Sequence, residues 1–385
     1  MKICILTPRF PFPENGGDVL RINNVARYLK AQGHSLCLVS FAPPKPDLSK
    51  AAKLYDSIYC VTFSKVRAYF FSLIYYLIGK PMQCGYYHSA TFMRVLQEVI
   101  EKEHPDKYVA HLLRMTPYLE QLGLQQQSIV EMTDALSKTY ALAEHAKGGG
   151  LMQWIYRLEQ LRIQRYEIWV TKTFPKVVLV SQRDIDYLQA LCPLSKSLVF
   201  KTNGVKSLPE CPTMYDPNKI CFVGNMRTLQ NQDAVLRFVK QTFPLILQQQ
   251  PNAVFYIIGS EPPAKIKALA SEHVVVTGFV EDIQTAIQDS CVMVAMVSIA
   301  AGIQNKVLAA MGCGTPVVLT SLIAQAIPEL KNAEHAIVAD TVDEIAAAIL
   351  NLMKNPNKRN VVGQAGYNLV KQHYTWDAKL HDYDK

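Results

Sequence analysis

The sequence contains no pair of cysteines spaced as Cys-x-x-Cys, although nine of its 385 residues are cysteine. Their irregular spacing argues against a zinc site or a disulfide scaffold and indicates reduced thiols in a reducing compartment. Cys291 and Cys313 stand among apolar residues, so we expect both to fill the core.

No cleavable signal peptide, short-period repeat or low-complexity segment is visible either. The first ten residues, MKICILTPRF, hold a short apolar stretch and lead to Pro11 and Pro13, without the apolar core of a signal peptide. We therefore expect a cytoplasmic protein. A chain of 385 residues, 49% of them hydrophobic, can bury a large core and is long for one domain, so two domains are expected.

Acidic residues are fewer than basic ones, 32 against 40, which gives a formal net charge of +8. Such a surplus suits nucleic acids, membrane surfaces or phosphate-bearing substrates. The basic residues are spread along the chain without an RNA- or DNA-binding motif, so we expect no nucleic acid partner.

Long hydrophobic runs are absent, and residues 65–87, KVRAYFFSLIYYLIGKPMQCGYY, come closest to one. Their apolar run of about a dozen residues is too short to cross a bilayer, which needs about 20. Two alternatives remain. The segment is a buried helix, or it lies on the inner face of an anionic membrane with its tyrosines at headgroup depth and with Lys65, Arg67 and Lys80 near the phosphates.

The hydrophobic pattern predicts an alternation of strands and helices in each half of the chain. In the first half we expect a helix over 19–32, helical structure over 150–174, and strands at 3–7, 35–41, 107–111, 128–132 and 176–180. Residues 202–219 are rich in proline and asparagine and have the composition of a linker. In the second half we expect helices over 234–249 and 283–288, and strands at 220–223, 253–258, 274–277, 292–296, 316–319 and 335–338.

This pattern predicts an α/β protein of two domains. The first covers 1–202 and the second covers 203–364. A helix over 365–385 is expected to pack back on the first domain. Ligands of open parallel sheets bind at the carboxyl ends of the strands, so we expect a cleft between the two sheets.

Two glycine-bearing turns point to a phosphate-bearing ligand. Gly16 and Gly17 stand between a strand end and a helix start, where backbone N–H groups can approach an anion, although such pairs often only make turns. The turn AAGIQNK leads into a second helix and ends in Lys306, which is either a ligand to a diphosphate or a solvated surface lysine. Arg227, in the loop after the first strand of the second domain, could supply a further cation for a leaving diphosphate.

These motifs resemble those of the family 4 glycosyltransferases of the GT-B fold, which include bacterial exopolysaccharide, O-antigen and teichuronic acid sugar transferases. The resemblance covers nearly the full chain, in the segments ILTPRFPFPENGGDVLRINNVARYLKAQGHSLCLVSF, TNGV, FVGN, FYIIGS, VTGFVEDI, GIQNKVLAAMGCGTPVV and HYTWDAKL. It implies two Rossmann-like, doubly wound parallel-sheet domains facing a cleft, with the first domain (1–202) on the acceptor side and the second (203–364) binding the nucleotide sugar.

The resemblance also implies roles for residues by position. Gly16 and Gly17 would lie near the donor phosphates, and His111 close to the transferred sugar, with Arg227 and Lys306 as cations for the diphosphate. The residues implied to line the nucleotide are Gly259, Ser260, Phe279, Val280, Gly302, Ile303, Gln304 and Asn305. Arg21, Arg114 and Asp134 are further candidates on the acceptor side or in the cleft, whereas Glu159 and Glu167 are expected to form salt bridges within their helix.

The chain departs from the family pattern at a position that normally binds the donor ribose. Ala309 stands where the family has this ribose-binding glutamate. Ala300, Ala301 and Gly302 occupy the neighbourhood of the other glutamate of the family pattern, which precedes it. The family's basic residues after the second opening strand fall near Asn225 and Asn231. A lost charged hydrogen bond typically weakens binding by about 1.5 to 3 kcal/mol, roughly one to two decades in affinity.

The resemblance implies a retaining, metal-independent hexosyltransferase without a cofactor, which uses a UDP- or GDP-type sugar donor and a glycan or lipid-linked acceptor in cell-surface polysaccharide synthesis. Two alternatives stay open. The absence of a carboxylate at Ala309 would suit a degenerate homologue that acts as a scaffold or regulatory partner. A sugar-nucleotide 2-epimerase of the same fold would convert its donor with no acceptor present.

Overall fold

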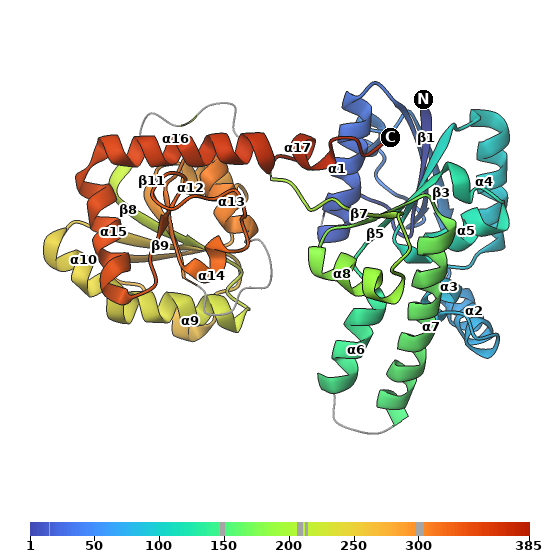
Figure 1. Cartoon of the computed structure of the whole chain (residues 1–385), viewed down its shortest axis with the longest axis horizontal. Coiled ribbons are helices and arrows are strands. Elements are labelled where there is room, and N and C mark those ends of the chain that lie inside the picture. The colour runs from blue at the N-terminus through green and yellow to red at the C-terminus, as the bar shows by residue number, and fades with distance from the viewer. Residues whose placement is uncertain (15, 147–150, 206–210, 212–214, 297–303) are drawn as a thin grey trace. The chain divides into compact units, whose positions relative to one another are not determined.

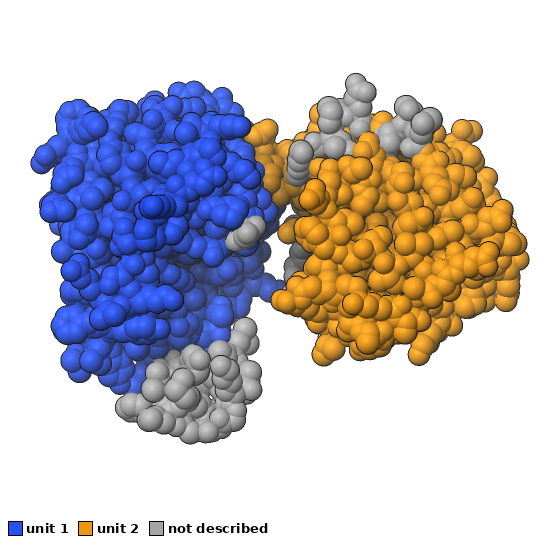
Figure 2. Space-filling model, turned by 180° about the vertical axis from the view of Figure 1, so that it is seen from behind, with its two compact units in different colours: residues 1–203, 380–385 blue, residues 204–379 orange. Residues whose placement is uncertain are grey.

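The computed structural model describes residues 1–14, 16–146, 151–205, 211, 215–296 and 304–385. The chain forms two compact units, residues 1–203 with 380–385 (unit 1) and residues 204–379 (unit 2), which Figure 2 shows in two colours. This division lies one residue from the predicted boundary at 202/203. The segment that rejoins unit 1 begins at Leu380, whereas the sequence suggested 365.

Unit 1 is built on a seven-stranded parallel sheet in the order β3-β2-β1-β4-β5-β6-β7. Its strands are β1 (Lys2–Thr7), β2 (Ser35–Ala42), β3 (Ser57–Thr62), β4 (Lys107–His111), β5 (Ser128–Thr133), β6 (Lys176–Leu179) and β7 (Leu198–Phe200). The central strand β1 has five consecutive buried residues, as expected for a strand covered on both faces. The strand order reverses between β1 and β4, which marks the expected ligand crevice of this unit.

Helices connect these strands and flank the sheet (Figure 1). They are α1 (Gly17–Ala31), α2 (Lys65–Leu77), α3 (Met82–Tyr86), α4 (Ala90–Glu103), α5 (Thr116–Gln121), α6 (Leu136–Ala146), α7 (Leu151–Thr173) and α8 (Gln182–Leu191). Helices α6 and α7 pack side by side and project beyond the sheet.

Unit 2 repeats the architecture with a six-stranded parallel sheet in the order β10-β9-β8-β11-β12-β13. Its strands are β8 (Asp216–Val223), β9 (Val254–Ile258), β10 (Val274–Gly278), β11 (Ser290–Ala295), β12 (Val317–Leu319) and β13 (Ile337–Val338). Its helices are α9 (Leu229–Arg237), α10 (Phe243–Gln249), α11 (Ala264–Lys267), α12 (Ile283–Gln288), α13 (Asn305–Gly312), α14 (Ser321–Ala324), α15 (Val342–Lys354), α16 (Pro356–His373) and α17 (Trp376–Leu380), the last of which ends in unit 1.

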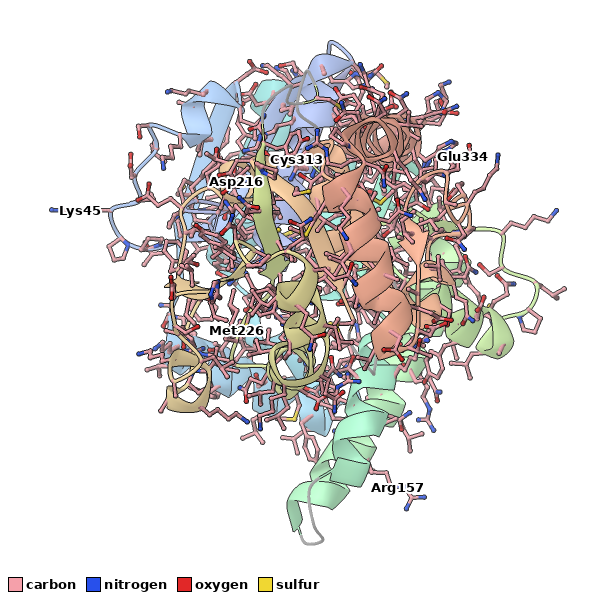
Figure 3. The ribbon with its side chains drawn as sticks, turned by 90° about the vertical axis from the view of Figure 1, so that its left-hand side faces the viewer. Lys45, Arg157, Asp216, Met226, Cys313 and Glu334 are labelled. Carbon is pink, nitrogen blue, oxygen red and sulfur yellow. The ribbon has the colours of Figure 1, made fainter. Side chains whose placement is uncertain are left out.

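The structure confirms that Cys291 and Cys313 fill the core. All nine are free thiols, and both Cys291 and Cys313 are fully buried in the core of unit 2, where Figure 3 labels Cys313. Among the described residues, no helix has the length and apolar character needed to span a bilayer.

The buried-helix alternative for residues 65–87 is wrong for most of helix α2. Only Ala68, Ser72 and Tyr75 of this helix are buried. Several of its large apolar side chains lie in the open, among them Val66 and Leu77, which are 81% and 73% exposed.

Candidate functional site

The loops that follow four strands of unit 2 end at one edge of its sheet. Because every strand pair in this sheet is parallel, the carboxyl ends of the strands lie together there. The strand order reverses between β8 and β11, at the middle of this edge. Most of the predicted donor-binding residues follow these strands: Arg227 after β8, Gly259 and Ser260 after β9, Phe279 and Val280 after β10, and residues 304–306 after β11.

Backbone contacts join the loops after β8, β9 and β10. The Gly259 N–H donates to the Gly278 carbonyl at 3.1 Å, and the Met226 N–H donates to the Ser260 carbonyl at 3.0 Å. A Cβ atom at Gly259 would lie only 1.8 Å from the carbonyl oxygen of Gly224, so this position has no room for a side chain. The backbone groups of these three loops are therefore closely packed at this edge of the sheet.

Lys306 provides the most perturbed amine described at this edge. Its Nζ donates to Asn231 Oδ1 at 2.7 Å and lies 4.3 Å from the centre of the Phe222 ring. Burial lowers the pKa of Lys306 to about 8, because the apolar surroundings disfavour the charged form. Asn231 is itself held by a 2.9 Å hydrogen bond to the Asn225 carbonyl. The structure thus contradicts the alternative of a freely solvated lysine.

The turn before α13 is only partly described. Gly302 and Ile303 lie outside the described residues, whereas Gln304 and Asn305 begin the helix. No side chain of the described chain caps this helix end, so the N–H groups of Asn305 and Lys306 point out of its first turn. The N–H groups at the start of α13 and the amine of Lys306 are therefore close together.

The other predicted donor contacts of unit 2 are more exposed. Arg227 forms an ion pair with Glu261, and the two side chains are 68% and 53% exposed. Phe279 is 74% exposed, whereas Val280 packs against the core of the unit. An exposed ion pair contributes little to stability, so the Arg227 guanidinium can exchange Glu261 for another anion at little cost.

His111 ends β4, at the reversal point of the unit 1 sheet. It is 2% exposed, and neither of its ring nitrogens has a hydrogen-bond partner. Burial lowers the pKa of His111 to about 3; the charge of Asp18 opposes this shift, and that of Arg21 adds to it. The imidazole is therefore neutral near pH 7, with two polar atoms left to pair with a ligand.

The predicted glycine loop leads into α1 at the same reversal point. Gly16 has a φ of 116°, which side-chain-bearing residues rarely adopt, and Gly17 is the first helical residue. A Cβ atom at Gly16 would lie 2.9 Å from Nη2 of Arg9, which forms an ion pair with Asp18. Arg9, two residues after the end of β1, is thus a further cation beside this glycine that the sequence motifs did not indicate.

Arg21 has a structural environment rather than that of a ligand contact. Its side chain is fully buried and faces Glu131, with Nε and Nη2 at 3.2 and 3.3 Å from the two carboxylate oxygens. Nη1 donates to the Thr202 carbonyl at 2.9 Å. We therefore correct the expectation that Arg21 lines the cleft, because its guanidinium is already engaged inside unit 1.

The remaining acceptor-side candidates are more open. Arg114 lies over the Tyr87 ring, 5.2 Å from its centre, in the short turn after β4. Asp134 is exposed and directly follows β5. Both stand at the carboxyl edge of the unit 1 sheet, as His111 does.

Glu159 and Glu167 do not form the expected salt bridges within α7. Glu167 is fully buried and accepts hydrogen bonds from the Ser137 N–H, at 3.2 Å, and from the Ser137 hydroxyl, at the start of α6. Burial raises the pKa of Glu167 to about 7. Glu159 faces the start of α3, and the Gln83 N–H donates to it at 3.4 Å. Both carboxylates therefore interact with helix starts.

Two Asp-x-Asp triplets, at 184–186 and 382–384, could suggest a metal site, but their side chains interact with neighbouring protein groups. Asp184 pairs with Lys138 at 2.7 Å, and Asp384 lies 2.9 Å from His34 Nε2. Asp186 accepts from Gln182, and Asp382 pairs with Lys385. Within the described part of the chain, no group of three or more metal-ligating side chains could hold an ion.

Comparison with known proteins finds a family match over part of the chain. Residues 217–355 match the family described as glycosyl transferases group 1, and these residues lie entirely in unit 2. No curated protein sequence matches the chain significantly.

Solved structures resemble the whole chain. The complex of Anabaena Alr3699/HepE with UDP is 13% identical, with a TM-score of 0.60 and coverage of 98% of this chain and 97% of that one. Sucrose-phosphate synthase from Thermosynechococcus elongatus is 14% identical, with a TM-score of 0.60 and coverage of 98% and 96%. WaaG, a glycosyltransferase involved in lipopolysaccharide biosynthesis, is 14% identical, with a TM-score of 0.56 and coverage of 98% and 97%. The predicted GT-B fold, with two parallel-sheet α/β domains, is thus confirmed.

Proposed function

We propose that the chain is a glycosyltransferase that moves a sugar from a nucleotide-diphosphate donor to a glycan or lipid-linked acceptor. The observation that carries this proposal is the desolvated amine of Lys306, which stands at the start of α13 beside the reversal point of the unit 2 sheet. The family match over residues 217–355 includes this lysine. Complexes of HepE with UDP and UDP-glucose support a UDP-type donor, with GDP sugars as the alternative.

Lys306 and Arg227 would stabilise the departing diphosphate together with the N–H groups that begin α13. The resemblance puts the family's basic residues near Asn225 and Asn231, where this chain has amides. The Lys306 amine, at the start of α13, donates a hydrogen bond to Asn231. A cation from α13 therefore lies beside one of the positions where the family has a basic residue. The other nucleotide contacts would be Gly259, Ser260, Phe279, Val280 and residues 302–305.

On the acceptor side, His111 would face the transferred sugar and form a hydrogen bond with one of its hydroxyls. A histidine with a pKa of about 3 is a poor proton acceptor at neutral pH, so its role is to orient the sugar and not to act as the general base. Gly16 and Gly17 would approach the donor phosphates, and Arg114 and Asp134 would lie near the acceptor. As in family 4 enzymes, we expect retention of the anomeric configuration without a metal ion.

Ala309 makes one consequence of the proposal testable at a single position. It lies half-buried on α13, where the family's ribose carboxylate is expected. We expect Ala309→Glu to tighten donor binding by about one to two decades, because it restores a charged hydrogen bond. Ala309→Gln is the matched control, since it adds a side chain of similar size without the charge. Weaker binding by both folded variants would mean that the pocket has been rebuilt around alanine.

The deciding experiment is calorimetric titration with UDP-, GDP- and dTDP-sugars and the free nucleotides. Binding of one donor class supports the transferase, and the anomeric proton signals of the product then distinguish retention from inversion. Silence across the panel in a folded protein would contradict the proposal and favour a scaffold that has lost donor binding. Conversion of the donor without an acceptor would favour the epimerase.

A role in cell-surface polysaccharide synthesis is the finer part of the proposal. It is supported by the motif resemblance and by the fold likeness to WaaG, which acts in lipopolysaccharide biosynthesis. Transfer to a lipid-linked glycan, and none to free sugars, is the expected outcome of an acceptor screen.

A further inference from the structure

Helix α2 exposes a continuous apolar face. The exposed fractions are 81% for Val66, 67% for Tyr69, 60% for Phe70, 56% for Leu73 and 73% for Leu77, and Ile78, just after the helix, is 60% exposed. We call these six residues the α2 face. Their spacing of three or four residues puts most of them on one side of the helix. Large apolar residues gathered this way usually mark an interaction surface.

The opposite side of α2 is firmly held. Ser72 donates to the Met82 carbonyl at 3.2 Å, and the Tyr75 hydroxyl lies 3.2 Å from His88 Nδ1. A Cβ atom at Gly85 of α3 would lie 2.5 Å from the Phe71 carbonyl oxygen, which leaves no space between the two helices. The α2 face is therefore presented in a fixed orientation.

The chain segment that carries the α2 face has charges of one sign. Residues 57–97 contain no aspartate or glutamate, whereas they contain Lys65, Arg67, Lys80 and Arg94. Lys80 lies 3.6 Å from Glu120, while Lys65 and Arg67, in the first turn of α2, form no ion pair among the described residues. An apolar face flanked by cations suits an anionic surface.

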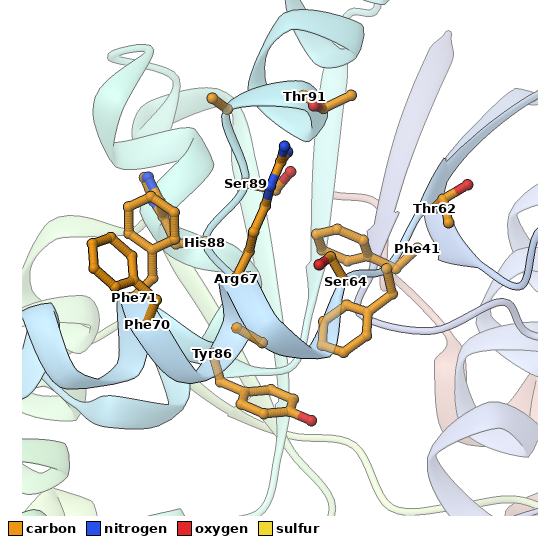
Figure 4. A pocket seen from close by; sticks show the side chains of 13 residues that line it. Phe41, Thr62, Ser64, Arg67, Phe70, Phe71, Tyr86, His88, Ser89 and Thr91 are labelled. Atoms are coloured by element: carbon orange, nitrogen blue, oxygen red, sulfur yellow. The ribbon is translucent and has the colours of Figure 1, made fainter.

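A pocket of about 330 Å³ adjoins this helix (Figure 4). Aromatic rings line much of it, including Phe70 and Phe71 of α2, and the Arg67 side chain extends across it toward Ser89 and Thr91. Its wall also includes Phe41 from β2 and, from the end of β3, the residue Thr62. The α2 face thus continues toward the carboxyl edge of the unit 1 sheet, the edge at which His111 ends β4.

We propose that the α2 face binds the surface of an anionic lipid bilayer, with α2 lying parallel to it. The helix has 13 residues, or about 20 Å, against the roughly 30 Å of a hydrocarbon core, so it can lie in the interface but not span it. Leu73 and Leu77 enter the acyl boundary, Tyr69 stays at headgroup depth, and Lys65 and Arg67 meet lipid phosphates. This inference does not rest on the proposed transferase activity.

Cosedimentation of the full chain with vesicles tests the proposal. We expect binding to vesicles of phosphatidylglycerol and phosphatidylcholine, weak binding to phosphatidylcholine alone, and loss of affinity as salt is raised. Leu73→Ser with Leu77→Ser should weaken binding at least tenfold, since two largely exposed leucines lose their apolar contact with the bilayer. The matched control is Leu194→Ser with Val361→Ser, at two other exposed apolar positions, which should bind as the unchanged chain does.

The charge contribution has its own pair of variants. Lys65→Gln with Arg67→Gln should reduce binding to the anionic vesicles severalfold, whereas Lys45→Gln with Lys50→Gln should not, although it removes the same charge. Lys45 extends into solvent in Figure 3. Thermal melting and donor titration of each variant establish that both units remain folded.

Three results would overturn the proposal. The first is that the chain binds neither kind of vesicle. The second is that the α2-face variants and their control variants lose vesicle affinity to the same extent. The third is a concentration-dependent dimer that the two leucine substitutions abolish, which would assign the α2 face to a second copy of the chain. If the chain binds the donor but not the vesicles, the membrane proposal fails while the transferase proposal stands.

Discussion

The pH dependence of donor binding gives the sharpest test of Lys306. Burial lowers the pKa of this amine to about 8, so its charge changes within the range where a binding assay can be run. The protonated amine attracts a diphosphate, and the neutral amine does not. Donor affinity should therefore be greatest below pH 7 and fall as the pH rises through 8.

The size of this effect follows from the fraction of protonated amine. With a pKa of about 8, about 97% of the amine is charged at pH 6.5 and about 24% at pH 8.5, so affinity should fall about fourfold between these values. The diphosphate of a sugar nucleotide is a diester whose charge is constant over this range, whereas a free nucleoside diphosphate takes up a proton. Calorimetric titration should therefore use the intact nucleotide sugar.

Two variants assign the effect to its residue. Lys306→Met should bind the donor more weakly and with no dependence on pH in this range. Arg227→Met should also bind more weakly but keep the fourfold change, because an arginine stays charged throughout and its loss leaves Lys306 in place. A flat profile for the unchanged chain, or the same fourfold change in Lys306→Met, would refute the reasoning.

Three further changes test the packing inside the two units by urea unfolding or thermal melting. Burial raises the pKa of Glu167 to about 7, so between about pH 5 and 7 the native state binds more protons than the unfolded state. The free energy of unfolding of the parent chain, relative to that of Glu167→Gln, should therefore fall by about 1.4 kcal/mol per pH unit as the pH rises through this range. A difference that does not change with pH would contradict this. Arg21→Met leaves the buried Glu131 carboxylate without its cation and should lower the free energy of unfolding by about 3 to 5 kcal/mol. The double variant Arg21→Met with Glu131→Leu should recover most of this stability. Equal loss of stability in the single and double variants would contradict a stabilising pair. Gly259→Ala should lower the melting temperature of unit 2, since its Cβ would lie 1.8 Å from a carbonyl oxygen, whereas Gly17→Ala has open space and should not.

The interior of each sheet was predictable from sequence because central parallel strands are buried on both faces. Their continuous apolar runs, such as KICILT in β1, indicate strands directly. The edge strands β3 and β7 were missed, since SIYCVT in β3 is mostly half-exposed or exposed and β7 has only three residues. The predicted linker over 202–219 also hid the start of β8, because DPNK at its beginning is polar.

The sequence was sufficient to propose a location for the candidate site but not the pairings of its residues. The order of strand, loop and helix indicates which edge of a sheet a residue occupies, and this was sufficient to propose His111 and Lys306. It does not reveal that Asn231, 75 residues before Lys306, accepts a hydrogen bond from that amine. Helical spacing likewise suggested partners for Glu159 and Glu167 within α7, whereas each faces another helix. Such contacts depend on tertiary packing, which local spacing does not encode.

Burial alone does not separate structural polar residues from candidate ligand contacts; what separates them is whether the buried charge or polar atoms are compensated inside the protein. Arg21 is fully buried with the Glu131 carboxylate and the Thr202 carbonyl around it, so a ligand has little to add. His111 is also buried, but both of its nitrogens lack partners, and an unpaired buried polar group costs about 1 to 3 kcal/mol. The lowered pKa of Lys306 corresponds to about 3 kcal/mol of desolvation of its charged form. Because both residues stand at a reversal point of strand order, a ligand that satisfies them recovers part of this energy, and donor binding should therefore raise the pKa of Lys306.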